Sequence, residues 1–337
     1  MNRFQQYLEE KSFLLADGAT GTNYFALGLE TGHPPELWNI EHPERVLEIH
    51  RRFLAAGSDL ILTNSFGGTS YRLKLHGAED QVGTLNRKAA SLAREAVKAH
   101  ADETGRDEAL VAGSIGPSGE LFAPLGVLDH AAACAAFTEQ AEALAEGGVD
   151  LLWIETISSF EEVDAALEAA RSTGLPVAAT MTFDTAGKTM MGVSPDDYVA
   201  HVSARGVVAA GANCGVGPAE LMHSMGIMAG AATVPLIAKG NCGIPEYIDG
   251  DIHYHGSPAL MARYAVLARD AGIRVIGGCC GTTPDHIAAM RQALDETPPG
   301  GPVDEARLVA ELGQPWAGLD TDQPKPGRTS RRGRRRS

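Results

Sequence analysis

Two adjacent cysteines stand among glycines at the end of an apolar run, in the stretch VIGGCCGTTPDHI from Val275 to Ile287. Thiol side chains can form disulfides, bind metals or act as nucleophiles. The chain holds five cysteines, an odd number. Its first twenty residues show no secretory leader, and no apolar run approaches the roughly 20 residues of a membrane span, so we expect a cytoplasmic protein without membrane contact. Because thiols stay reduced in that compartment, a structural disulfide is disfavoured.

Three of the cysteines can supply a zinc site. Three thiolates bind zinc when sulfurs from separate parts of the chain converge at Zn–S distances of about 2.3 Å. Cys214 ends another apolar run, and we expect it to meet Cys279 and Cys280. Adjacent residues of a regular strand point to opposite faces, but the glycines on both sides of the pair allow a kink that turns both sulfurs inward. After the kink, Thr283 and Pro284 are typical of a helix start.

Other interpretations of these thiols stay open at this point. Core packing and a vicinal disulfide are the alternatives for Cys279 and Cys280. Cys242, at the end of a further apolar run, is a candidate fourth ligand. Four thiolates would make the site closed and structural rather than catalytic.

Eight apolar runs that stop at Gly, Pro, Asn or Asp predict the strands that position these residues. The runs alternate with stretches of helical spacing that end at a glycine, such as FLAAGSD and LAEGGVD. Near-continuous apolar strands separated by helices indicate a parallel sheet covered on both faces. We therefore predict a single (β/α)8 TIM barrel over residues 1–318. An open, doubly wound sheet is disfavoured because DGATGT does not fit the glycine fingerprint of a nucleotide site. The predicted strands begin at Leu14, Asp59, Leu110, Asp150, Pro176, Gly206, Pro235 and Arg274.

Polar and reactive residues gather at the predicted carboxyl ends of these strands. Barrel enzymes build their active sites on that face, so the distribution indicates an enzyme. The residues are Asp17, Asn64, Glu155, Asn213, Cys214, Asn241, Cys242, Cys279 and Cys280.

The charge of the chain is unevenly placed. The net charge is −15, with 44% hydrophobic and 21% charged residues, which is typical of a compact enzyme and does not favour binding to a phosphate backbone. Residues 319–337 form a Pro/Arg-rich tail with seven basic residues and no acidic residue after Pro324. We expect this tail to be disordered. It could also lie on the acidic body or make a subunit contact, so a homo-oligomer stays open.

Seven short motifs resemble those of the homocysteine S-methyltransferases. They are DGATGT at Asp17, TNSF at Thr63, GSIGP at Gly113, ET at Glu155, GANCG at Gly211, GNCGIP at Gly240 and GGCCG at Gly277. This family includes betaine–homocysteine methyltransferase and the homocysteine domain of cobalamin-dependent methionine synthase. The resemblance runs from about residue 12 to about residue 295, with the motifs in order on the predicted strands. One departure is Cys242, which replaces the usual alanine of N-A-G.

The resemblance implies a reaction and its residues. The family's zinc thiolates fall on Cys214, Cys279 and Cys280, and its zinc-dependent reaction transfers a methyl group to the homocysteine thiol to give methionine. The family's amino-acid site falls on Asp17, with Gly18 beside it, and on Glu155, which takes the homocysteine ammonium. Asn213, in the GANCG motif, is included in this predicted site.

The methyl donor is predicted from aromatic residues, since a quaternary ammonium or sulfonium group favours aromatic faces. Trp38, Phe66 and Tyr254 are the candidates, and glycine betaine is the predicted donor. Against this, the aromatic that follows the strand-two phenylalanine in animal betaine enzymes is Gly67 here. S-methylmethionine, another sulfonium, methylfolate and methylcobalamin are the alternative donors.

Two functions outside this class are less well supported by the sequence. A zinc hydrolase would need histidine and carboxylate ligands, and the strand ends offer few histidines. A vicinal-dithiol redox or metal sensor would use Cys279 and Cys280, without a substrate pocket around Asp17 and Glu155.

Overall fold

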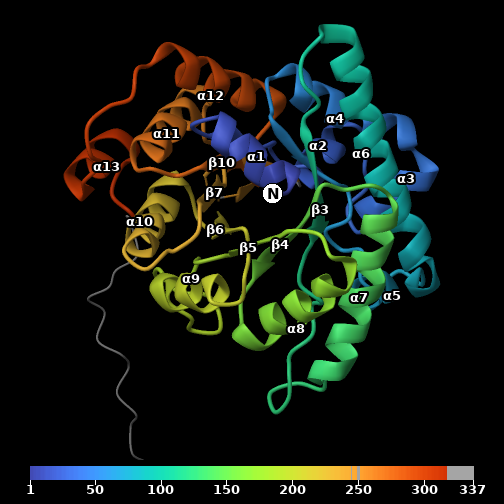
Figure 1. The fold of residues 1–337 in the computed structure, drawn as a ribbon. Helices are drawn as coiled ribbons and strands as arrows, with labels where there is room; N and C mark the ends of the chain where they lie inside the picture. Colours follow the sequence, from blue (N-terminus) through green and yellow to red (C-terminus); the bar gives the residue numbers. More distant parts are fainter. Residues whose placement is uncertain (244, 249–250, 317–337) are drawn as a thin grey trace, which may run out of the picture.

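Eight parallel strands form one closed barrel in the computed structural model, which describes residues 1–243, 245–248 and 251–316 (Figure 1). The strands pair in the order β1-β10-β7-β6-β5-β4-β3-β2. The barrel is closed by contacts between β1 and β2, the first and last strands of this order. Ala16 forms a parallel bridge with Leu60, and the Asp59 N–H donates to the Leu15 carbonyl at 2.7 Å. The predicted barrel is confirmed. The strands are β1 (Leu14–Leu15), β2 (Leu60–Leu62), β3 (Leu110–Ile115), β4 (Leu151–Ile157), β5 (Val177–Met181), β6 (Ala209–Cys214), β7 (Leu236–Gly240) and β10 (Val275–Gly278).

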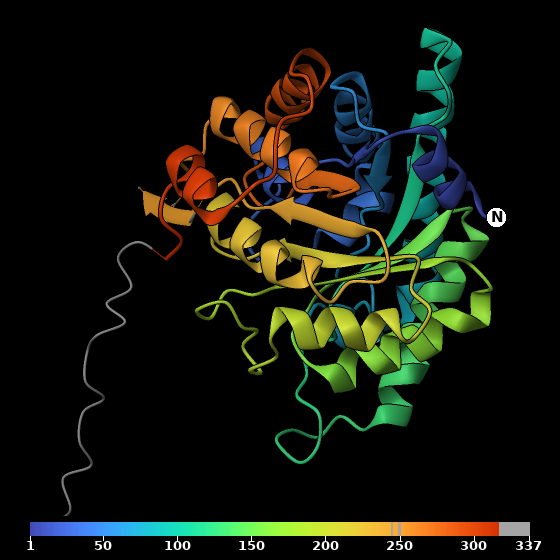
Figure 2. The same ribbon diagram turned by 60° about the vertical axis from the view of Figure 1, so that its left-hand side comes forward.

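Helices surround the barrel (Figure 2), and several of them begin at capping residues. Ser159 accepts a hydrogen bond from the Glu162 N–H at 3.2 Å, and Thr283 and Pro284 open the last barrel helix as predicted. The helices are α1 (Arg3–Glu10), α2 (Gly21–Ala26), α3 (Trp38–Glu41), α4 (Pro43–Ala55), α5 (Ser70–Lys74), α6 (Val82–Thr104), α7 (His130–Glu146), α8 (Phe160–Ala170), α9 (Pro195–Ser203), α10 (Pro218–Ala229), α11 (Pro258–Asp270), α12 (Pro284–Glu296) and α13 (Glu305–Leu312). Short 3-10 helices are η1 (Pro35–Leu37), η2 (Glu79–Gln81) and η3 (Arg171–Thr173).

A small antiparallel hairpin interrupts the alternation after the seventh barrel strand, and the sequence analysis did not anticipate it. It consists of β8 (Pro245–Ile248) and β9 (Asp251–Tyr254). In Figure 2 the hairpin lies at the side of the molecule opposite the N-terminus. The predicted tail, residues 319–337, lies outside the described residues. In the described part of the chain no helix combines the length and apolar character needed to cross a membrane.

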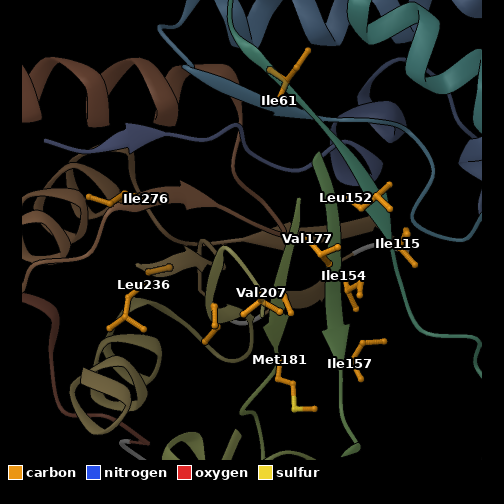
Figure 3. Close-up of a cluster of buried hydrophobic side chains, with 14 of the residues drawn as sticks. Ile61, Ile115, Leu152, Ile154, Ile157, Val177, Met181, Val207, Leu236 and Ile276 are labelled. Atoms are coloured by element: carbon orange, nitrogen blue, oxygen red, sulfur yellow. The ribbon is translucent and has the colours of Figure 1, made fainter. Parts of the chain in front are cut away.

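Two apolar cores follow from the two-residue period of the strands. Ile61, Leu152 and Ile276 point from the barrel toward the helices and belong to the larger core (Figure 3). Their neighbours Leu60, Leu151 and Val275 belong to the second core, inside the barrel, which also takes in apolar side chains of α1. Because side chains alternate between the two faces, each strand has one fixed set of inward residues.

Acid is expected to destabilise the fold through His50, a fully buried residue of α4. Neither of its ring nitrogens has a hydrogen-bond partner among the described residues, and burial lowers its pKa to about 4. The unfolded chain, with a His pKa of about 6.5, therefore binds the proton more tightly than the folded chain. The contribution of neutral His50 to the free energy of unfolding is complete above about pH 6.5, the pKa in the unfolded chain. It is lost as pH falls from about 6.5 toward 4, and the loss is about 2 kcal/mol at pH 5. Urea unfolding at pH 7.5 and 5 measures the loss; a His50→Leu variant with the same pH dependence would contradict it.

Candidate functional site

Three thiols converge at the carboxyl end of the barrel. Cys214 is the last residue of β6, and Cys279 and Cys280 directly follow β10. The Cys214 and Cys279 Sγ atoms are 2.8 Å apart, and the three sulfurs all lie within 4.8 Å of one another. A disulfide bond is only about 2.0 Å long, so these are separate thiols, and all five cysteines are free.

The backbone turns sharply at both places to bring the sulfurs together. The Cys279 N–H still donates to the Gly240 carbonyl at 2.7 Å, which extends the β10–β7 ladder by one residue. Gly281 then adopts φ +78°, and a Cβ there would lie 2.3 Å from the Tyr254 ring, so only glycine fits. The predicted glycine kink is therefore present at Gly281. Cys214 itself has φ +57°, a left-handed conformation that the sequence did not reveal.

The cluster favours a bound cation. Hydrogen bonds from Cys214 and Cys279, together with one from the Tyr254 hydroxyl, hold the pKa of Cys280 far below its usual value. The pKa of Cys214 is raised well above its usual value, first because it is hydrogen-bonded to the other two thiols. One negative charge is therefore accommodated by the thiols alone, and ionising all three requires a positive ion. Three sulfurs of this kind fit the donor set of an open zinc site.

Cys242, the candidate fourth ligand, points elsewhere. Its thiol is fully buried, donates to the Gly256 carbonyl at 2.7 Å and lies 3.1 Å from Nε2 of His286. Its backbone N–H donates to the Cys280 carbonyl at 2.9 Å. Among the described residues, the thiol cluster consists of Cys214, Cys279 and Cys280. Cys242 therefore supports the turn behind the cluster.

A buried ion pair lies beneath the thiols. Lys239 Nζ lies 2.6 Å from Asp17 Oδ1, and the Leu62 N–H donates to Oδ2 at 2.8 Å. Both charged side chains are almost completely buried, and the ammonium lies 5.6 Å from the centre of the Trp153 ring. Burial raises the pKa of Asp17, and Lys239 opposes that shift. Asp17 is thus fixed inside the barrel by a lysine that the sequence analysis overlooked. The two-residue period could have found it, because Ile237 and Lys239 share one face of β7.

Glu155 lies in the same inward tier, two residues beyond Trp153. Its carboxylate accepts from the Ser114 hydroxyl at 2.6 Å and from Asn213 Nδ2 at 3.3 Å. Burial raises the pKa of Glu155 to about 7. Asn213 also donates to the Thr156 hydroxyl at 2.7 Å and approaches Cys214 Sγ at 3.6 Å. Asn213 therefore connects the carboxylate to the thiol cluster.

A cavity of about 450 Å³ opens above these groups. The three clustered cysteines line it together with Gly18, Glu155, Lys239 and Phe66, whereas Asp17 is not among its lining residues in the described part of the chain. Trp38, predicted to contact the donor, is 3% exposed and does not line the cavity. Its ring packs on Tyr24, with the centroids 5.4 Å apart, and under the Arg45 guanidinium at 4.8 Å.

Tyr254, which was predicted to contact the donor, lies against the thiol cluster and is not among the described residues that line the cavity. Its ring covers Gly281 and its hydroxyl is hydrogen-bonded to Cys280. Two cavity residues that the sequence analysis did not single out are Glu36, on η1, and Arg72, on α5.

A model of the homocysteine S-methyltransferase family matches residues 14–294, which covers the whole barrel. The chain belongs to this family. Known structures agree with the assignment. The homocysteine methyltransferase MmuM from Escherichia coli, in its metallated form, superimposes with a TM-score of 0.73 at 29% identity, over 86% of this chain and 99% of that one. The oxidized form of the same enzyme superimposes with a TM-score of 0.73 at 30% identity, over 87% of this chain and 99% of that one.

Methionine synthases are similar over one part of their length. The protein from Mycobacterium leprae is 31% identical over 309 residues, or 86% of this chain, and that from Mycobacterium tuberculosis is 30% identical over 298 residues, or 83%. The chain spans about a quarter of the length of these two relatives.

Proposed function

We propose that this chain transfers a methyl group to the thiol of homocysteine, giving methionine, with zinc held by Cys214, Cys279 and Cys280. Family membership and the convergence of three thiols in one cavity support this proposal. When bound, zinc supplies the positive charge that keeps an incoming thiol deprotonated at neutral pH. The metallated form of the similar E. coli enzyme is consistent with this role.

Homocysteine has two further charged groups, and the cavity offers a partner for each. The carboxylate of Glu155, held by Ser114 and Asn213, is the proposed partner of the ammonium group. Gly18 and Thr20 line the cavity, and their backbone N–H groups have no hydrogen-bond partner among the described residues. Unpaired N–H groups are suitable donors to a carboxylate. Asp17 contributes indirectly, by holding Lys239 under the site.

The transfer needs little from the protein beyond alignment. The homocysteine sulfur attacks the methyl carbon, an S–C bond forms, and the bond from that carbon to the donor nitrogen breaks with its electron pair left on nitrogen. With glycine betaine the products are methionine and dimethylglycine, and nothing is oxidised or reduced. Holding sulfur and methyl group in line can lower the barrier by about 7–11 kcal/mol. Cavity walls that exclude water also protect the thiolate from protonation.

Glycine betaine is the proposed donor. Phe66 lines the cavity and can lie against a quaternary ammonium group. Metal content of the reduced protein, measured alongside methionine formation with betaine, S-methylmethionine and a methylfolate, tests reaction and donor together. Roughly one zinc per chain and turnover with betaine are the expected results. Turnover only with another donor would reject betaine. A zinc-free protein whose thiols oxidise reversibly would instead indicate a dithiol sensor.

Glu155→Gln is expected to weaken homocysteine binding. The amide keeps the hydrogen bond from Ser114 but loses the charge that attracts the ammonium group. Losing one charged contact in a buried site costs about 2–3 kcal/mol, so kcat/KM for homocysteine should fall about 30- to 150-fold, with zinc content unchanged. Steady-state kinetics measure the change. Glu161→Gln, an exposed residue six positions further on, is the control. Equal effects of the two substitutions would remove Glu155 from the substrate site.

A further inference from the structure

Glu36 places a buried carboxylate in the wall of the cavity. It lies on η1, in the connection that follows β1, and is only 5% exposed. Its Oε1 accepts a hydrogen bond from the Gly67 N–H at 2.6 Å. No described cation lies within salt-bridge distance of Glu36; burial raises its pKa, and the nearby charges of Arg72 and His76 oppose that shift. A buried carboxylate without an ion-pair partner is costly unless a ligand supplies the positive charge.

Gly67 makes room for this carboxylate. A Cβ on Gly67 would lie 3.0 Å from Glu36 Oε1 and 3.4 Å from its carboxyl carbon, so a larger residue would displace the Glu36 side chain. An aromatic face and a carboxylate both attract an onium cation, the first through its quadrupole and the second through its full charge. The cavity therefore has an anionic group, Glu36, in addition to the aromatic ring of Phe66.

Arg72 provides the opposite charge in the same cavity. It lies on α5, after β2, and its side chain passes beside Gly119, where a Cβ would come within 3.2 Å of Nη1. Within the described residues Arg72 forms no salt bridge, although its charge does favour the ionised form of Glu36. The two groups thus line one cavity without neutralising each other in direct contact. Both side chains can therefore reach a ligand in this cavity.

We propose that Glu36 and Arg72 form a dipolar subsite that selects a methyl donor carrying both an onium cation and a carboxylate, with Glu36 facing the cation and Arg72 the carboxylate. This inference rests on the proposed methyl transfer and specifies the donor that it uses. Betaine and S-methylmethionine share the required chemistry, whereas a methylfolate has no onium methyl group of this kind. Glu36 and Arg72 are therefore specificity-determining residues.

Two non-reacting analogues of betaine each carry only one of its two charged groups, so that the roles of Glu36 and Arg72 can be tested separately. Choline keeps the quaternary ammonium group but lacks the carboxylate, and tert-butylacetate keeps the carboxylate and the shape but lacks the cation. Inhibition constants of both, and KM for betaine and S-methylmethionine, are measured on the zinc-loaded full chain and on Glu36→Gln and Arg72→Gln variants. Gln at position 36 can still accept the Gly67 hydrogen bond, so a purely structural role would leave binding unchanged. Glu30→Gln, an exposed change in the same connection, is the control.

Glu36→Gln is expected to weaken betaine and choline about tenfold or more while tert-butylacetate stays within about twofold. Arg72→Gln should do the reverse, weakening betaine and tert-butylacetate and sparing choline. KM for homocysteine should not change in either variant. The proposal is overturned if Glu36→Gln leaves choline binding at the wild-type value, or if it weakens all three ligands equally.

Failure of the reaction itself would look different. If no donor yields methionine, the proposed function is wrong, and calorimetric titration of choline and tert-butylacetate into the same proteins still decides whether the subsite exists. Turnover with betaine and wild-type constants in both variants would reject the subsite alone. If the variants behave as expected, the ratio of KM values for betaine and S-methylmethionine identifies which of the two donors the subsite prefers.

Discussion

Cys214→Ser is expected to lose its zinc and, with it, methyl transfer. The three sulfurs lie within 4.8 Å of one another, and a serine hydroxyl is a far weaker zinc ligand than a thiolate. Changing groups that merely orient metal ligands costs about 10- to 100-fold in affinity or activity, so removing a ligand should cost more than about 100-fold. Metal analysis of the purified, reduced protein and a methionine-formation assay measure both effects. Cys280→Ser should behave in the same way.

A fourth cysteine provides the matched control for this experiment. Cys242 lies one hydrogen bond behind the cluster, but its thiol faces His286 and the Gly256 carbonyl. Cys242→Ser keeps a hydroxyl donor in that place and should retain zinc and activity within about threefold of the wild type. Zinc lost from Cys242→Ser but kept in Cys214→Ser would show that the metal is bound elsewhere. Wild-type zinc content in all three variants would remove the cysteines from the metal site altogether.

The convergence of Cys214 with Cys279 and Cys280 could be predicted because a parallel barrel brings every strand's carboxyl end to one face. Apolar runs bounded by glycine and asparagine located those ends to within a few residues. The same argument placed Glu155 and Asn213 beside the thiols, and the structure joins them by a hydrogen bond. Strand ends are thus the part of the site that sequence patterns determine best.

Side chains in the connecting loops were harder to place. Trp38 is the first residue of α3, in the connection between β1 and α4, and its ring packs into the core against Tyr24. Glu36, on η1 of the same connection, lines the cavity instead. The aromatic residue was predicted because an onium donor favours aromatic faces, and nothing in the sequence distinguished Glu36 from the glutamates that are usually exposed. The direction of each side chain depends on η1 and α3, two short turns whose start and end carry weak signals. Lys239 was not predicted for another reason. A lysine in an apolar strand can be recognised as buried only when the residues that face the barrel interior are known, and Asp17 was not known to be one of its neighbours.

Lys239→Met is expected to destabilise the fold strongly. Asp17 is fully buried, and the substitution would leave its carboxylate with only the Leu62 N–H as a partner. Breaking a buried ion pair by removing one partner costs about 3–5 kcal/mol, and protonation of Asp17 limits the cost, since burial already raises the pKa of that group. Urea unfolding at pH 7.5 measures the change. Arg87→Met, which breaks an exposed pair with Glu146, is the control and should cost less than about 1 kcal/mol.

The double variant Asp17→Asn/Lys239→Met distinguishes an ion pair from simple packing. With both charges gone, no uncompensated charge stays in the barrel, so the double variant should be more stable than Lys239→Met alone by about 1–3 kcal/mol. If the stability losses of the two single variants simply add, Asp17 and Lys239 are not energetically coupled. Zinc binding provides a second measurement on the same proteins. A folded double variant should still bind the proposed zinc because the three clustered cysteines are unchanged, even though Lys239 no longer supports the proposed amino-acid site.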